Sequence, residues 1–186
     1  EESSKAVAEL ISQAELYSRT GIQKQNFNTI YQLYADKLSG KLEKAKHLME
    51  INQAAEVKAG NISEEDSKKL QERIAFTADM NDLSDADFLV EAIAEKLPIK
   101  HDFYSKLSDI ISEDAILCSN TSGLSITKIS EAVKNPSRFA GMHWMNPSHL
   151  IPCIEIIRGT ETDDESTNAV IELAHAVGKK TTVCKK

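Results

Sequence analysis

Short runs of consecutive apolar residues alternate with segments of helical periodicity from about residue 60 to the end of the chain. The runs DFLVEAIAE, DAILCSN and RFAGMHW have the pattern of strands that are covered on both faces. Between them, apolar residues recur three and four positions apart, as on one face of a helix. This alternation predicts an α/β fold with a mostly parallel sheet and helices on both faces.

Helix start and stop signals support this division. Ser63 and Ser125 are suitable N-caps, and Pro98 suits a first helical turn. The acidic pair at 163–164 favours a helix start, and Gly178 favours the end of that helix.

Three further segments have the composition of strands. RIAFTADM, at residues 73–80, is predicted to be a strand, and KTTVCKK, at 180–186, is predicted to contain the last one. IPCIEIIRG, at 151–159, alternates enough to lie near a sheet edge or to run antiparallel.

The first 60 residues follow a different pattern. Residues 38–57 are helix-like, while NTIYQLYAD, at 28–36, could form a strand. The seven glycines are scattered, and none fits the G-x-G-x-x-G spacing of a phosphate-binding turn between a strand and a helix. The glycine-rich first βα turn is therefore not found.

Composition argues against several classes of protein. A net charge of -7 argues against nucleic acid as a partner, and no apolar run approaches the roughly 20 residues that a membrane span needs. The first residues, EESSKAV, do not have the pattern of a signal peptide. Cys118, Cys153 and Cys184 have no C-x-x-C spacing, so neither a disulfide framework nor a metal site is indicated. We expect a cytoplasmic protein of one domain.

Polar residues follow three of the predicted strands. They are Glu91 and Glu95, then Ser119, Asn120, Thr121 and Ser122, then His143 and Asn146. Each has a simpler interpretation when taken alone: Ser122 and Ser125 could cap a helix, and His143 could be a hydrogen-bonded core histidine. Because ligands bind at the carboxyl ends of strands in such sheets, we expect Glu95, Asn120, Ser122, His143 and Asn146 to converge on one cleft.

His143 and Glu155 have complementary properties. Histidine can take and return a proton near neutral pH. Glu155 lies within an apolar run, where a carboxylate is costly to bury unless it is paired, and a histidinium on an adjacent strand would pair with it. We predict a hydrogen bond between them; the alternative is that Glu155 faces outward at a sheet edge.

Four segments, LVEAIAEKLPIK, ILCSNTSGLSIT, RFAGMHWMNP and IEIIRGTETDDES, closely resemble the nucleotide-binding domain of the L-3-hydroxyacyl-CoA dehydrogenase family. The resemblance runs from about residue 38 to residue 186. It implies a Rossmann-like NAD-binding domain over 1–186, with residues 1–37 divergent and the family's helical C-terminal domain absent from the sequence.

The resemblance also implies roles for individual residues. His143 matches the catalytic base, Glu155 the acid paired with it, and Ser122 the serine that contacts the substrate oxygen. Five residues would bind the cofactor NAD: Glu95, Lys100, Asn120, Asn146 and, as the ribose-binding acid, Asp36. An alternative alignment places EESSKAV just after that acid, followed by a long insertion.

The implied reaction is the NAD-linked oxidation of an L-3-hydroxyacyl-CoA to the 3-ketoacyl-CoA in fatty-acid metabolism. An acyl-CoA is then the substrate, and the intact family protein would be a homodimer. One alternative is a dehydrogenase of another 3-hydroxy acid. Another is a non-catalytic binding or interaction module, which the missing glycine turn favours and the retention of Ser122, His143 and Glu155 opposes. We expect this chain alone to bind NAD weakly and to be barely active.

Overall fold

The structure, a computed structural model, describes residues 39–146, 148 and 151–184. Asp36 and the possible strand at 28–36 lie outside these residues. None of the helices in the described ranges is both long and apolar enough to cross a membrane.

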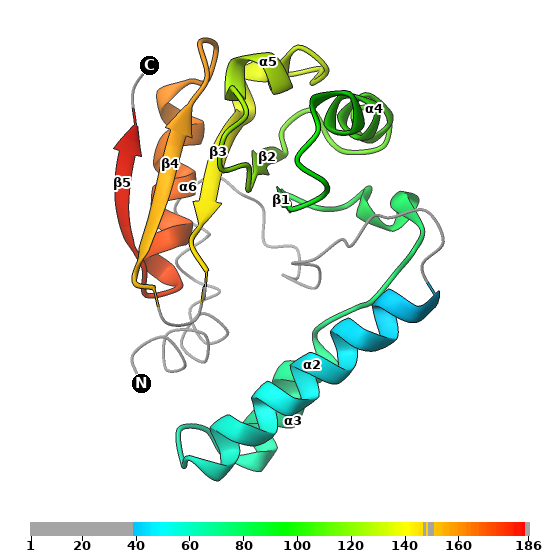
Figure 1. The fold of residues 1–186 in the computed structure, drawn as a ribbon, viewed down its shortest axis with the longest axis vertical. Coiled ribbons are helices and arrows are strands. Elements are labelled where there is room, and N and C mark those ends of the chain that lie inside the picture. Colours follow the sequence, from blue (N-terminus) through cyan, green and yellow to red (C-terminus); the bar gives the residue numbers. More distant parts are fainter. Residues whose placement is uncertain (1–38, 147, 149–150, 185–186) are drawn as a thin grey trace.

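In the described part of the chain, five strands form one sheet, in the order β1-β2-β3-β4-β5 (Figure 1). The strands are β1 (Phe88–Glu91), β2 (Ile116–Ser119), β3 (Phe139–Trp144), β4 (Cys153–Arg158) and β5 (Lys180–Cys184). Strands β1, β2 and β3 are parallel, β4 is antiparallel to β3, and β5 is parallel to β4. The mostly parallel sheet and the antiparallel direction of β4 are confirmed. The sheet edge beyond β4 is formed by β5.

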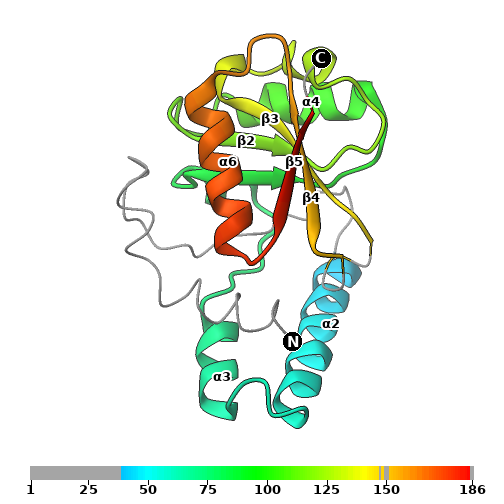
Figure 2. The ribbon, with the colours of Figure 1, turned by 90° about the vertical axis from the view of Figure 1, so that its left-hand side faces the viewer.

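Helices cover both faces of the sheet, as predicted (Figure 2). On one face lie α4 (Leu97–Leu107) and α5 (Ile126–Ser130), and on the other lies α6 (Asp164–Ala176). Successive side chains of a strand point to opposite faces. Accordingly, Leu117 packs into the cluster formed with α4 and α5, whereas Ile116 packs into the cluster formed with α6.

The predicted helix boundaries follow the expected signals. The Ser63 hydroxyl accepts a hydrogen bond from the backbone nitrogen of Asp66 at 3.0 Å, and the Asp163 carboxylate accepts one from that of Ser166 at 2.7 Å. Pro98 lies in the first turn of α4. Gly178 has a φ of 73°, a left-handed conformation that suits the residue following a helix.

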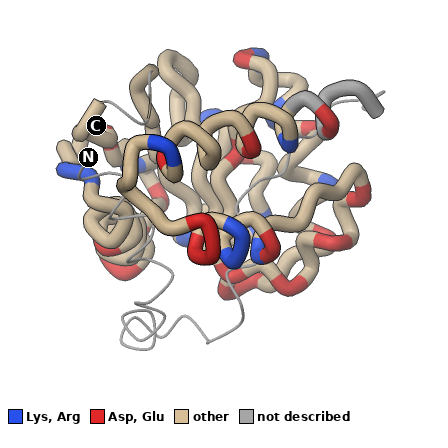
Figure 3. The backbone as a smooth tube through the Cα atoms, turned by 90° about the horizontal axis from the view of Figure 1, so that it is seen from below, with Lys and Arg blue, Asp and Glu red and all other residues tan. Residues whose placement is uncertain are grey.

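A helical hairpin lies away from the sheet (Figure 1). It consists of α2 (Ser39–Lys58) and α3 (Glu64–Glu72), which agrees with the helix expected at 38–57. The hydroxyl of Ser67 donates to Gln53 Oε1 at 2.9 Å and joins the two helices. Figure 3 shows Lys and Arg positions interspersed among Asp and Glu positions along the chain.

The prediction of a strand at 73–80 is wrong. Residues 74–79 are irregular, and a 3-10 helix, η2 (Met80–Leu83), follows them. Thr77 Oγ1 accepts from the backbone nitrogen of Asp79, and Asp79 Oδ1 accepts from that of Asn81, each at 2.9 Å. Such local side-chain bonds to the backbone compete with strand pairing. A second 3-10 helix, η3 (Pro136–Arg138), precedes β3.

Candidate active site

His143 and Glu155 lie directly opposite one another in the antiparallel pair of β3 and β4. Residues paired in this way have side chains on the same face of the sheet. The Nδ1 atom of His143 lies 2.8 Å from Glu155 Oε2, so the predicted hydrogen bond is confirmed. The two side chains are 21% and 36% exposed, which leaves the pair partly open to solvent. Ile154 and Ile156 face α6 instead and are completely buried.

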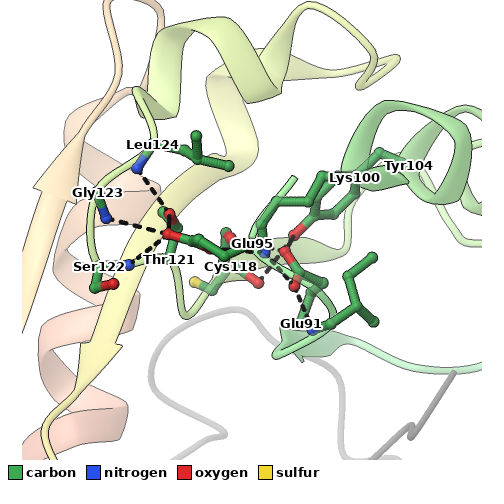
Figure 4. A network of polar contacts seen from close by, with 11 residues as sticks. Glu91, Glu95, Lys100, Tyr104, Cys118, Thr121, Ser122, Gly123 and Leu124 are labelled. Carbon is green, nitrogen blue, oxygen red and sulfur yellow. Dashed lines mark hydrogen bonds and ion pairs between the residues drawn. The ribbon is translucent and has the colours of Figure 1, made fainter. Parts of the chain in front are cut away.

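The carboxylate of Glu95 holds the turn that follows β2 (Figure 4). Its Oε1 atom accepts hydrogen bonds from the Thr121 hydroxyl at 2.5 Å and from the backbone nitrogens of Ser122 and Gly123, both at 3.1 Å. Partial burial would raise the pKa of Glu95, but the hydrogen bonds from Thr121 and Gly123 and the charge of Lys100 outweigh burial and lower this pKa. Glu95 is therefore a carboxylate that fixes the backbone around Ser122.

Asn120 joins the ends of three strands. Its backbone nitrogen donates to the carbonyl oxygen of Glu91 at 2.7 Å, and its side-chain oxygen accepts from the backbone nitrogen of Trp144 at 2.7 Å. Trp144 follows His143 in β3. The turn after β2 is thus tied both to β1 and to the strand that carries the candidate base.

The structure brings some predicted site residues together and leaves others apart. Glu95 contacts Lys100 and the backbone of Ser122, while Asn120 contacts the residue next to His143. The exposed side chain of Asn146 makes no hydrogen bond to any described residue, and the same is true of the Ser122 hydroxyl. That all of them line one cleft stays a prediction.

Lys100 lies inside the protein. Its side chain is 1% exposed, and its Nζ atom is 2.6 Å from Glu91 Oε1 and 3.5 Å from Glu95 Oε2. Four of the residues expected to bind the cofactor lie in the described part of the chain. Of these four, Lys100 is the least accessible to a ligand.

Glu91, for which the sequence pattern predicts no role, lies buried beside Lys100. Its buried carboxylate accepts hydrogen bonds from the Lys100 ammonium, the backbone nitrogen of Ile93, the Ser119 hydroxyl and the Tyr104 hydroxyl. Burial, and next the Glu91 charge, raise the pKa of Tyr104 well above its ordinary value, so its hydroxyl stays a donor. In the sequence, the feature that could have indicated this ion pair is an acid at the end of an apolar run with a lysine nine residues later.

No group of three or more His, Cys, Asp or Glu side chains in the described ranges is placed to hold a metal ion. The polar residues at and just after the carboxyl ends of β1, β2 and β3 include Glu91, Glu95, Asn120, Ser122 and His143. Such groups suit a ribose and a carboxamide, which need hydrogen-bond donors and acceptors at one edge of a sheet.

The parallel strands, the helices on both faces and this polar edge define a Rossmann-like dehydrogenase domain. The family model described as 3-hydroxyacyl-CoA dehydrogenase, NAD binding domain, matches residues 22–186, and the chain belongs to this family. NAD is the cofactor of this domain family.

Individual relatives agree with this assignment. The chain is 44% identical over 112 residues to the "Probable 3-hydroxybutyryl-CoA dehydrogenase" of Deinococcus radiodurans, which covers 60% of this chain and 40% of that protein. It is 39% identical over 114 residues to the 5-formyl-3-hydroxy-2-methylpyridine 4-carboxylate 5-dehydrogenase of Mesorhizobium japonicum, covering 61% of this chain and 37% of that one. The chain thus spans about two fifths of the length of these relatives.

A solved structure gives the same result for the fold. The crystal structure of Mycobacterium tuberculosis FadB2 superposes with a TM-score of 0.77 at 29% identity, covering 93% of this chain and 59% of that one.

Proposed function

We propose that the protein containing this chain oxidises an L-3-hydroxyacyl-CoA to the 3-ketoacyl-CoA with NAD, and that His143 is the general base. The observation that carries this proposal is the 2.8 Å contact between His143 Nδ1 and Glu155. A carboxylate accepts a hydrogen bond, so this contact favours the tautomer in which Nδ1 carries the proton and Nε2 can accept one.

In this reaction Nε2 of His143 takes the proton of the substrate hydroxyl as the carbon–oxygen double bond forms. Glu155 stabilises the imidazolium and keeps the ring oriented. The Ser122 hydroxyl holds the substrate oxygen, and the Glu95 carboxylate holds the Ser122 backbone. Bound NAD would supply the acceptor for the hydride that leaves C3. Asn120, Asn146, Glu95 and Asp36 are the proposed contacts to the cofactor.

Two alternatives have some support. The Mesorhizobium japonicum relative is named for a substrate that is not an acyl-CoA, which favours a dehydrogenase of another hydroxy compound. The sequence has no G-x-G-x-x-G motif, which favours a non-catalytic module of the same fold. A homodimer and a cytoplasmic location remain predictions.

The test is the oxidation of NADH with acetoacetyl-CoA by the gene product that contains residues 1–186. We expect turnover, and a fall in kcat of about 10²- to 10⁴-fold in the His143→Gln variant. His175→Gln is the matched control, because His175 is an exposed histidine on α6. A folded protein without turnover would support the non-catalytic module. Turnover of other 3-hydroxy acids but not of the acyl-CoA would support a dehydrogenase of another hydroxy compound.

A further inference from the structure

Lys179 is a buried lysine with a role that the candidate site does not explain. The residue is 6% exposed, and its Nζ atom donates to the carbonyl oxygens of Ser148 at 2.6 Å and Ile151 at 2.8 Å. No carboxylate of the described residues forms an ion pair with this ammonium, and burial lowers the pKa of Lys179. Burying an ammonium against neutral groups alone is costly. Stability alone therefore does not account for a lysine at this position.

The backbone on both sides of Lys179 is fixed by hydrogen bonds. Its own nitrogen donates to the carbonyl oxygen of Ala174 in α6 at 2.9 Å, and the preceding Gly178 has the left-handed conformation that ends the helix. The following residue, Lys180, begins β5, and its nitrogen donates to the carbonyl oxygen of Pro152 at 2.7 Å. The ammonium of Lys179 is therefore carried by a fixed base.

These contacts lie at the edge of the sheet that carries the candidate site (Figure 1). Because β4 runs antiparallel to β3 and β5 runs parallel to β4, the starts of β4 and β5 lie beside the carboxyl end of β3. The connection from β3 to β4 carries Asn146, a proposed cofactor contact with an exposed side chain. Lys179 holds the same connection at Ser148, two residues further along the chain, and again at Ile151.

We propose that Lys179 is a positioning residue, which holds the connection between β3 and β4 and so places Asn146 for the cofactor without contacting the cofactor itself. An ammonium can donate to several carbonyl oxygens at once, which an apolar side chain cannot do. Holding a binding group in place before the ligand arrives lowers the ordering cost of binding. The consequence for the cofactor rests on the function proposed above, whereas the contacts of Lys179 with Ser148 and Ile151 do not.

The decisive variant is Lys179→Met, made in the gene product that contains residues 1–186, because methionine removes the ammonium with little change of volume. Lys180→Met is the matched control, since it removes the ammonium of the next residue, which is exposed. The first measurement is the backbone order parameter of Asn146 and Ser148 by nuclear magnetic resonance. We expect it to fall by about 0.1 or more in Lys179→Met and to stay at the wild-type value in Lys180→Met.

The second measurement is the dissociation constant of NADH, obtained by fluorescence titration without turnover, in a double-mutant cycle with Asn146→Ala. We expect Lys179→Met to raise this constant about three- to tenfold, because the loss of one hydrogen bond weakens binding by about tenfold. In the Asn146→Ala background the same substitution should change it less than about twofold. Lys180→Met should leave the constant within about twofold of wild type. Lys179→Arg, which keeps the charge and the donors, should bind NADH more tightly than Lys179→Met.

Unchanged order parameters at Asn146 and Ser148 would overturn the inference. So would unchanged NADH affinity in a folded Lys179→Met variant, because the lysine would then only stabilise the fold. An equal loss of affinity with and without Asn146 would also overturn it, because an additive effect means that the ammonium contacts the cofactor directly.

If Lys179→Met does not fold, Lys179→Gln replaces it in both measurements, because glutamine keeps a donor but is shorter than lysine and carries no charge. A wild-type protein that does not bind NADH would refute the proposed function. The order parameters would still decide whether Lys179 holds the connection between β3 and β4.

Discussion

The side-chain oxygen of Asn120 accepts a hydrogen bond from the backbone nitrogen of Trp144 at 2.7 Å. This contact ties the turn after β2 to the residue that follows His143. Because the same turn is held by Glu95, the candidate base and the candidate substrate contact Ser122 belong to one hydrogen-bonded framework. A change at either end of this framework is expected to affect the other.

Replacing Asn120 with alanine tests this link. The partly buried Trp144 nitrogen would lose its acceptor, and we expect the free energy of unfolding to fall by about 1–3 kcal/mol. Urea denaturation measures it. Asn120→Asp keeps an acceptor at the same place, so the two variants should differ in stability. If both variants lost the same unfolding free energy, the stabilising effect of Asn120 would not come from its side-chain acceptor.

The buried pair of Glu91 and Lys100 gives a second prediction. Lys100→Met alone leaves an uncompensated buried carboxylate, which should cost about 3–5 kcal/mol of stability. The double variant with Glu91→Gln should recover most of that loss. Thermal and urea denaturation of both variants provide the comparison, and a double variant no more stable than the single one would contradict the prediction.

The close approach of Gly141 to its neighbours gives a third prediction. A Cβ atom there would lie 2.9 Å from Ile126 Cδ1 and 2.9 Å from Ile157 Cβ. We expect Gly141→Ala to destabilise the fold by about 1–3 kcal/mol through overpacking. Gly123→Ala is the matched control, since a Cβ atom at Gly123 meets nothing within 4 Å. Denaturant midpoints of the two variants should differ clearly, and similar midpoints would rule out the steric explanation.

Much of this fold could be predicted from local patterns. The consecutive apolar residues of β2 are buried on both faces, and Ser63 and Asp163 cap the helices that follow them. The contact of His143 with Glu155 could also be predicted, because a carboxylate within an apolar run needs a partner.

Other features depend on how separate elements pack against one another. Lys100 on α4 lies 2.6 Å from Glu91 at the end of β1 and is buried there, whereas the family resemblance implied a contact with the cofactor. The wrong prediction of a strand at 73–80 has a related cause. Ile74 and Phe76 are only partly buried, and polar side chains nearby bond to the backbone instead of leaving it to a sheet.

The last prediction concerns the pH dependence of stability. Hydrogen bonds from Thr121 and Gly123 and the charge of Lys100 outweigh the effect of burial and lower the pKa of Glu95 from its ordinary value of 4.5. A carboxyl whose pKa is lower in the folded state stabilises the fold above the pKa of the unfolded state. This contribution is lost as the pH falls through the folded-state value. The side chain is 43% exposed, so solvent screening keeps the effect below about 1 kcal/mol.

Urea denaturation of wild type and Glu95→Gln measures this contribution as the difference between the two unfolding free energies. We expect that difference to be constant from about pH 7 to about pH 5.5 and to shrink below about pH 4.5, where the wild-type carboxylate takes up a proton. Asp163, whose pKa is also lowered, contributes to both proteins and cancels in the comparison. A difference that grows on acidification would mean that the folded state favours the protonated Glu95, and the hydrogen bonds to the turn would then not be those of a carboxylate.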